Sequence, residues 1–254
     1  MSLKVVQPYA YKGQTLIDHI TGCLNKLESF LYANPNYTWI AYARLSSAGV
    51  DVVEPEAIKD ALRLGVLVHD LGKVYRYYQE NIEKYGFEGH EILSAVSCYK
   101  ILKDYRILKD QRQLKVLLLI AVLNHHQAFR ESIPELLWSE TGFLIKKVKH
   151  IAKSGLCGSV ANLEPILKRF GLTVEETFTK DYSEFESIFN KIKELLVRFL
   201  CKNFDENRRW LKLHALLTFP IVLADDLDAY EKRGNKSAGD RLIIKELRRA
   251  IENE

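Results

Sequence analysis

Rows of apolar residues at helical spacing that run into histidine and aspartate constrain this sequence more than any other feature. The stretch from Leu64 to Tyr78, LGVLVHDLGKVYRYY, is the clearest case. Apolar residues recur at helical spacing from Ile58 to Val66, and the same row continues to His69 and Asp70. An ionised carboxylate on an inward face is costly to bury unless it is paired or binds a metal. The row therefore predicts a partner for Asp70; the alternative is a helix end that meets solvent.

The other histidines follow the same pattern. Of 7 histidines in the chain, five lie on apolar faces of predicted helices. The helices are expected at about 14–32, 55–70, 88–103 and 110–127, and the five residues are His19, His69, His90, His125 and His126. Neutral imidazole and carboxylate are ligands that suit Mn, Fe, Co, Ni or Zn. Five histidines with one or two aspartates are about the number of ligands that two ions need.

Length and composition favour one globular domain. The chain has 254 residues, of which 47% are hydrophobic and 28% charged, and it reads almost entirely as helix. We expect an all-α helical bundle over residues 1–254, with a core at about 10–235 and a charged helix at about 237–254. Four cysteines without a CxxC pair indicate a reducing, cytoplasmic location. No apolar run is long enough to cross a membrane, and the N-terminus lacks a signal core.

The residues argue for phosphate chemistry at a metal pair. A carboxylate shared by two ions holds them roughly 3.5–4 Å apart, the spacing used for in-line phosphoryl displacement. Asp70 is the candidate for that shared ligand, and Lys73 could neutralise charge that develops on the phosphate. A long helix ends in ADDLDAY, and periodicity cannot separate Asp225 from Asp226 as a further ligand. We therefore expect a metal-dependent phosphohydrolase on a helical scaffold.

Two stretches allow two interpretations each. Residues 73–88 alternate aromatic and basic side chains, which is typical of a platform for single-stranded nucleic acid, or of a loop fixed to the core by its aromatics. Residues 142–163 carry four lysines and no acidic residue, which predicts a phosphate-facing patch or, more often, a solvated helix face near an acidic neighbour. His150 is expected to be exposed, and His214 to be a core histidine rather than a ligand.

The ordered motifs resemble those of a known family. The set consists of His19, HDLGK at 69–73, HE at 90–91 with Ser94, HH at 125–126 and ADDLD at 224–228. It resembles the signature of the HD phosphohydrolase superfamily over about residues 10–235. Within that superfamily, the HExxS and HH motifs resemble the HD nuclease of type I CRISPR interference.

The resemblance implies a site and an activity. One metal would be bound by His19, His69, Asp70 and Asp225, and the second by Asp70, His90, His125 and His126. Asp70 would bridge, and Lys73 would assist catalysis at the scissile phosphate. The Ala-Asp-x-Leu-Asp pattern of the family prefers Asp225 over Asp226. The implied reaction is hydrolysis of single-stranded DNA, by exonuclease or endonuclease action, with ions such as Mg, Mn, Co or Ni.

The sequence also implies partners and leaves rivals open. It contains no GxxxxGK[ST] phosphate loop and no room for a helicase, so we expect a stand-alone nuclease subunit. A separate helicase and a crRNA-guided surveillance complex would deliver unwound DNA, and the charged helix at 237–254 is a candidate docking surface. The rivals are an HD enzyme acting on nucleotides, such as a phosphatase or cyclic-nucleotide phosphodiesterase, and a non-catalytic HD-like binding module.

Overall fold

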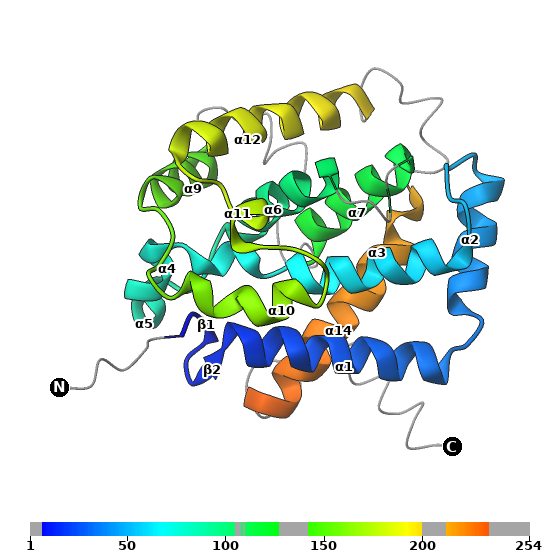
Figure 1. Cartoon of the computed structure of the whole chain (residues 1–254), viewed down its shortest axis with the longest axis horizontal. Coiled ribbons are helices and arrows are strands. Elements are labelled where there is room, and N and C mark those ends of the chain that lie inside the picture. The colour runs from blue at the N-terminus through cyan, green and yellow to red at the C-terminus, as the bar shows by residue number, and fades with distance from the viewer. Residues whose placement is uncertain (1–6, 105–107, 109, 127–141, 200–211, 234–254) are drawn as a thin grey trace.

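The fold is built from α-helices, with one small hairpin near the N-terminus (Figure 1). The computed structural model describes residues 7–104, 108, 110–126, 142–199 and 212–233. The prediction of an all-α helical bundle is confirmed. The predicted charged helix at 237–254 lies outside the described residues, and the predicted domain limits stay a prediction. Along the described part of the chain, no helix combines the length and apolarity needed to cross a bilayer.

Five long helices form the centre of the fold, and three of them carry predicted ligands within their spans. They are α1 (Leu16–Ala33), α3 (Pro55–Val68), α6 (His90–Asp104), α7 (Arg112–Asn124) and α14 (Ala215–Arg233). Helix α14 packs against α1, α3 and α7, while α6 packs against α7 and α3. This arrangement brings the first motif residue, His19, and the last motif, ADDLD at 224–228, together in the middle of the bundle.

The remaining elements surround this centre. They are β1 (Tyr9–Tyr11), β2 (Gln14–Thr15), α2 (Tyr37–Ser47), η1 (Leu71–Val74), α4 (Arg76–Glu80), α5 (Ile82–Tyr85), α9 (Phe143–Lys153), η4 (Val160–Leu163), α10 (Glu164–Lys168), α11 (Val174–Thr177), α12 (Tyr182–Val197) and η6 (Lys212–His214). Helix α12 packs on α6 and α9, across the molecule from α1 in Figure 1.

Local signals explain where the central helices begin. The Thr15 hydroxyl accepts a hydrogen bond of 3.1 Å from the backbone N–H of Asp18, which caps α1. Pro55 occupies the first turn of α3, where its missing N–H has no partner to lose. The apolar rows that predicted both helices are fully buried, as at Ile20 and Ile58.

A glycine lets α3 and α14 approach closely. A Cβ at Gly65 would overlap the side chain of Ile221. Residues four apart share a face of a helix, so the next residues on these two faces are His69 and Asp225. The close packing of Gly65 on Ile221 thus sets two predicted ligands side by side.

The chain before α1 differs from the prediction. The first helix was expected from about residue 14, but Gln14 and Thr15 pair with β1 in a short hairpin, with Tyr9 opposite Thr15 and Tyr11 opposite Gln14. Gly13 closes the turn with φ +83°, a conformation that glycine adopts at low cost. A two-residue strand is too short to leave a periodic signal in the sequence.

The aromatic stretch at 73–88 is largely helical and partly core. Tyr75 and Tyr78 are 3% and 1% exposed, and the Tyr78 hydroxyl donates a hydrogen bond of 2.6 Å to the backbone carbonyl of Glu88. The nucleic-acid platform is therefore wrong for these two tyrosines, because their rings cannot reach a base. The two tyrosines agree instead with the alternative interpretation, in which aromatic side chains fix the segment to the core.

The lysine-rich stretch forms one side of α9. Lys147 lies 2.6 Å from Glu88, and Lys149 lies 3.1 Å from Glu186 of α12. This agrees with the second interpretation, a solvated helix face beside acidic neighbours. His150 of the same helix is exposed, as expected.

Candidate metal centre

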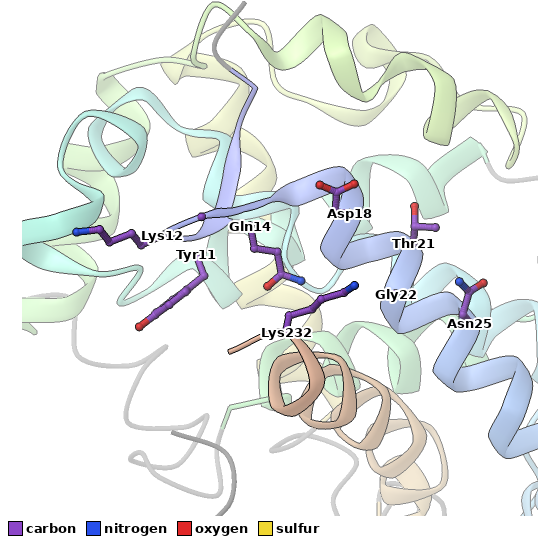
Figure 2. A pocket seen from close by; sticks show the side chains of 9 residues that line it. Tyr11, Lys12, Gln14, Asp18, Thr21, Gly22, Asn25 and Lys232 are labelled. Carbon is purple, nitrogen blue, oxygen red and sulfur yellow. The ribbon is translucent and has the colours of Figure 1, made fainter. Parts of the chain in front are cut away.

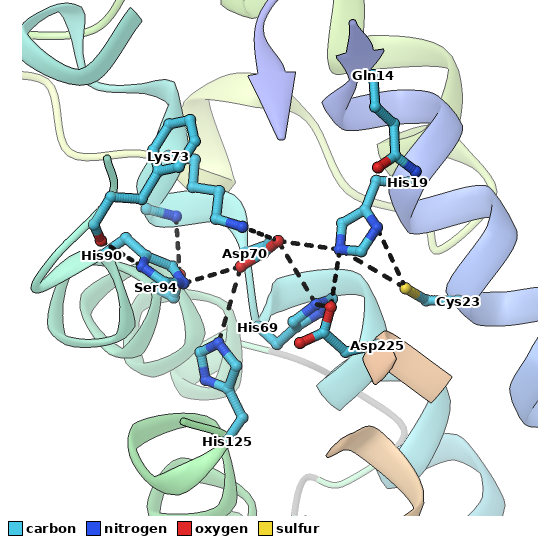
Figure 3. A network of polar contacts seen from close by, with 12 residues as sticks. Gln14, His19, Cys23, His69, Asp70, Lys73, His90, Ser94, His125 and Asp225 are labelled. Carbon is cyan, nitrogen blue, oxygen red and sulfur yellow. Dashed lines mark hydrogen bonds and ion pairs between the residues drawn. The ribbon is translucent and has the colours of Figure 1, made fainter. Parts of the chain in front are cut away.

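The predicted ligands come from six separate elements and meet at one place. Figure 3 shows His19, His69, Asp70, His125 and Asp225 pointing toward one another. His69 is the C-cap residue of α3, Asp70 is the N-cap residue of η1, and His90 is the first residue of α6. Every predicted ligand except His126 is buried. The fold therefore converges on a polar cluster inside an apolar core.

The cluster consists of two groups of candidate ligand atoms. Within each group, the atoms lie within 4.8 Å of one another. The first group is His19, Cys23, His69 and Asp225, and the second is Asp70, His90, His125 and His126. Asp226 belongs to neither group among the described residues.

Asp70 faces both groups, with one carboxylate oxygen toward each. Its Oδ2 lies 3.0 Å from Nε2 of His19 and 3.7 Å from Nε2 of His69. Its Oδ1 lies 2.9 Å from Nε2 of His90 and 3.7 Å from Nε2 of His125. A carboxylate in this position is suited to bridge two cations.

The backbone fixes the orientation of three imidazoles. The Nδ1–H of His69, His90 and His125 each donates to a carbonyl three residues earlier, at 2.7, 2.5 and 2.6 Å. Because the proton is on Nδ1, Nε2 carries a free lone pair that points toward the centre of the cluster. Metal-binding histidines are commonly oriented by such a second hydrogen bond.

His19 is oriented by a carboxylate that the sequence analysis left without a role. Its Nδ1 donates a hydrogen bond of 2.7 Å to Oδ2 of Asp228, and Nε2 of Gln14 donates one of 2.7 Å to the same oxygen. Asp228 lies one turn after Asp225 on α14. The spacing of three residues in ADDLD, which places both aspartates on one face of the helix, was the sequence signal that could have identified Asp228. Gly22 makes room for it, since a Cβ there would overlap the Asp228 carboxylate.

Buried atoms without partners show that the donor set fits a cation. Nε2 of His69 and Nε2 of His125 are buried and have no hydrogen-bond partner among the described residues. A buried polar atom left unsatisfied costs on the order of 1–3 kcal/mol. Both atoms point into the cluster, where a cation would satisfy them. The combination of imidazole and carboxylate is the donor chemistry of divalent transition metals.

Most of these groups hold the protonation state that metal binding requires. Burial lowers the pKa of His69 to about 4, and burial also lowers the pKa of His90. Burial opposes ionisation of Asp70, but Lys73 and the nearby histidines hold its pKa well below the usual value. Asp225 is likewise held ionised against burial, chiefly by its hydrogen bond with His19. Neutral imidazoles and ionised carboxylates are ready to coordinate.

His19 departs from this pattern. Burial lowers its pKa, but Cys23 and the carboxylates of Asp225, Asp228 and Asp70 outweigh burial and raise the pKa well above its ordinary value. The negative groups around His19 therefore attract a positive charge to this position. A metal ion would supply that charge and release the proton.

Lys73, the predicted catalytic lysine, lies at the edge of the cluster. It is 6% exposed, and its ammonium donates to Oδ2 of Asp70 at 2.5 Å. The same nitrogen lies 5.0 Å from the centre of the Phe87 ring. The lysine is thus held beside the Asp70 carboxylate by an ion pair and a cation–π contact.

Ser94 and Gly72 join the HDLGK motif to the HExxS motif. The backbone N–H of Gly72 donates to the Ser94 hydroxyl at 2.8 Å. A Cβ at Gly72 would overlap the backbone carbonyl of His90, so only glycine allows η1 to lie this close to α6. The serine of HExxS therefore has a structural role, which the sequence alone did not reveal.

A polar cavity of about 620 Å³ lies beside the cluster rather than at it (Figure 2). The hairpin, the first turns of α1 and Lys232 of α14 line it. Gln14 connects the two places, since it lines the cavity and donates to Asp228. His214 lies in neither ligand group among the described residues, as expected, but it is only partly buried rather than part of the core.

Comparison with known proteins supports the resemblance in the motifs. No protein-family model matches the chain. Two proteins named CRISPR-associated endonuclease Cas3-HD align over most of it. The one from Saccharolobus solfataricus is 27% identical over 96% of this chain and 98% of its own length. The one from Methanocaldococcus jannaschii is 23% identical over 91% and 92%.

Two further comparisons extend this result. The protein of the same name from Pyrococcus furiosus is 33% identical over 37% of this chain. Among solved structures, the CRISPR-associated Cas3 HD domain protein from Methanocaldococcus jannaschii matches with a TM-score of 0.58 and 21% identity, covering 85% of this chain and 99% of that chain. The structural match shows the helical fold.

Proposed function

We propose that this chain, a homologue of the Cas3-HD proteins over almost its whole length, is a metal-dependent nuclease that hydrolyses single-stranded DNA in CRISPR interference. The observation that carries the proposal is the position of Asp70, whose two carboxylate oxygens face two separate groups of ligand atoms. A binding module has no need for such a buried ligand set.

The residues divide into two proposed sites. His19, His69 and Asp225 would hold the first ion and His90, His125 and His126 the second, with Asp70 shared. Two divalent ions, chosen from Mg, Mn, Co or Ni, would activate water and stabilise charge on the phosphate undergoing in-line displacement. The chain itself keeps Asp70 ionised, lowers the pKa of His69 and His90 by burial, and turns Nε2 of these two histidines inward.

Lys73 is proposed to act on the substrate. Its ammonium pairs with Oδ2 of Asp70, the proposed bridging carboxylate. A fixed positive charge at that place would contact a phosphate oxygen and stabilise the charge that develops there. Phe87 and Asp70 restrict the lysine to this position, so little reorganisation is needed during the reaction.

The proposed context is the cytoplasm, with protein partners. The cysteines Cys23, Cys98 and Cys157 are free, which fits a reducing compartment. A separate helicase subunit and a crRNA-guided surveillance complex are the proposed partners that would supply unwound DNA. The name of the relatives favours endonucleolytic cleavage.

The test compares substrates with purified protein and Mn²⁺. We expect cleavage of linear and circular single-stranded DNA, and the circular form is cut only by an endonuclease. Asp70→Asn should abolish cleavage while circular dichroism shows a folded protein. His150→Ala, an exposed histidine outside both groups, is the matched control and should cleave like the wild type.

The rival functions predict different outcomes of that test. Faster hydrolysis of nucleotides or cyclic nucleotides than of DNA would favour a nucleotide phosphohydrolase. An unchanged background rate in Asp70→Asn would favour the non-catalytic module. Either outcome would overturn the nuclease proposal.

A further inference from the structure

A thiol lies inside the first ligand group. Cys23 follows His19 by one turn of α1 and is fully buried. Its Sγ lies 3.7 Å from Nε2 of His19 and 3.7 Å from Nδ1 of the same ring, as Figure 3 shows. The sulfur also lies within 4.8 Å of the ligand atoms of His69 and Asp225. The apolar row of α1 had indicated only a core residue at this position.

The distances between these atoms are close to those between neighbouring ligands of one metal ion. With ordinary metal–ligand bond lengths, a sulfur and a nitrogen on one ion lie about 3.6 Å apart, and a nitrogen and an oxygen about 3.4 Å. The sulfur of Cys23 lies 3.7 Å from Nε2 of His19, and that nitrogen lies 3.3 Å from Oδ1 of Asp225. Because the sulfur is as close to Nδ1 of His19 as to Nε2, the Cys23 side chain would rotate toward Nε2 to place all three atoms on one ion.

A second observation points to a ligand at the same place. The side chain of His69 is 0% exposed, and its Nε2 has no hydrogen-bond partner among the described residues. This nitrogen belongs to the same group as the Cys23 sulfur and lies 3.9 Å from Oδ1 of Asp225. A cation shared by the group would satisfy it.

We propose that Cys23 is a protein ligand of the first ion, which makes that position selective for a thiophilic divalent ion over Mg²⁺. The inference rests on the proposed metal centre and adds a ligand to it. Thiolate sulfur is a soft ligand that favours ions such as Zn²⁺, Cd²⁺ and Co²⁺, whereas Mg²⁺ prefers oxygen. The second group contains only imidazole and carboxylate donors, so the two positions differ in the metal that they prefer.

The test is spectroscopic and needs no substrate. Metal-free protein is titrated with Co²⁺, and near-ultraviolet absorption is followed for thiolate-to-cobalt charge transfer. We expect the band in the wild type and in Cys98→Ser, and its loss in Cys23→Ser. Cys98 is the matched control because it is equally buried, in α6, and lies outside both groups.

A competition titration gives a second readout. Cys23→Ser should bind Cd²⁺ roughly tenfold more weakly than the wild type, with a smaller change for Mn²⁺. Absence of the charge-transfer band in the wild type would overturn the inference, and this result does not depend on the folding of any variant. An unchanged band in Cys23→Ser would overturn it as well. Failure of the nuclease proposal would be seen separately, as absence of DNA cleavage by the wild type.

Discussion

The Nδ1 of His19 in α1 donates a hydrogen bond of 2.7 Å to Oδ2 of Asp228 in α14, across 209 positions of sequence. This bond turns Nε2 of His19 toward Asp70 and Asp225, at 3.0 and 3.3 Å. Asp228 does not face the cluster itself, so its effect on a bound ion would pass through His19. Carboxylates in this role commonly tune the affinity of the histidine that they hold.

Replacing Asp228 with asparagine is therefore expected to weaken binding of the first ion. The loss of the negative charge should lower Mn²⁺ affinity at that position roughly 10-fold to 100-fold, measured by isothermal titration calorimetry of metal-free protein. Glu231→Gln is the control, since Glu231 is an exposed residue of the same helix that pairs with Lys26 at 2.5 Å. Equal affinities in the two variants would contradict the assigned role of Asp228.

The second ligand group predicts a change in metal stoichiometry. His125→Ala removes an inward Nε2 from the group of Asp70, His90 and His126 but leaves the first group intact. Native mass spectrometry with Mn²⁺ should show two ions on the wild type and one on the variant. His150→Ala should keep two. Two ions on His125→Ala would show that this histidine is not a ligand.

Gly72 is predicted to be intolerant of a side chain. A methyl group there would overlap the backbone of α6 at His90, so Gly72→Ala must move η1 away from α6. We expect a loss of about 1–3 kcal/mol in the free energy of unfolding, measured by urea denaturation. Gly158→Ala is the control, because no atom lies within 4 Å of a Cβ at that position. Similar small losses in both variants would argue against the close packing.

The histidines of the cluster predict how the stability of the metal-free protein depends on pH. Burial lowers the pKa of His69 to about 4, from 6.5 when unfolded, and lowers those of His90 and His126 as well. Between pH 4 and pH 6.5 the unfolded state binds more protons than the folded state. The stability that is present above pH 6.5 is therefore lost as the pH falls toward 4. His19, with its raised pKa, acts in the opposite direction, so its contribution is lost as the pH rises.

An NMR titration checks this prediction residue by residue. The ring signals of His69 should stay those of a neutral imidazole down to about pH 4. Titration of His69 near its unperturbed value of 6.5 would contradict the predicted burial.

The inward direction of the ligands was predictable because it depends on local periodicity. His19, His69 and His125 each continue an apolar row of their own helix, so burial of the row buries the histidine. The choice between Asp225 and Asp226 was not predictable from periodicity, because adjacent residues differ by only about 100° around a helix. In the structure Asp225, and not Asp226, lies in a ligand group.

The supporting contacts were not predictable because they join distant segments. Asp228 meets His19 and Gln14, and Ser94 meets Gly72, only after the helices have packed. No periodicity within one helix carries that information. The aromatic stretch at 73–88 left two interpretations open for a related reason, since alternation of aromatic and basic residues does not reveal which rings the core will bury.

Anomalous diffraction at the manganese edge, from crystals soaked in Mn²⁺, tests the bridging role of Asp70 most directly. The account predicts two peaks roughly 3.5–4 Å apart, one beside each oxygen of Asp70. The first should also touch His19 and Asp225, and the second His90 and His125. A single peak, or no peak within coordination distance of Asp70, would contradict it.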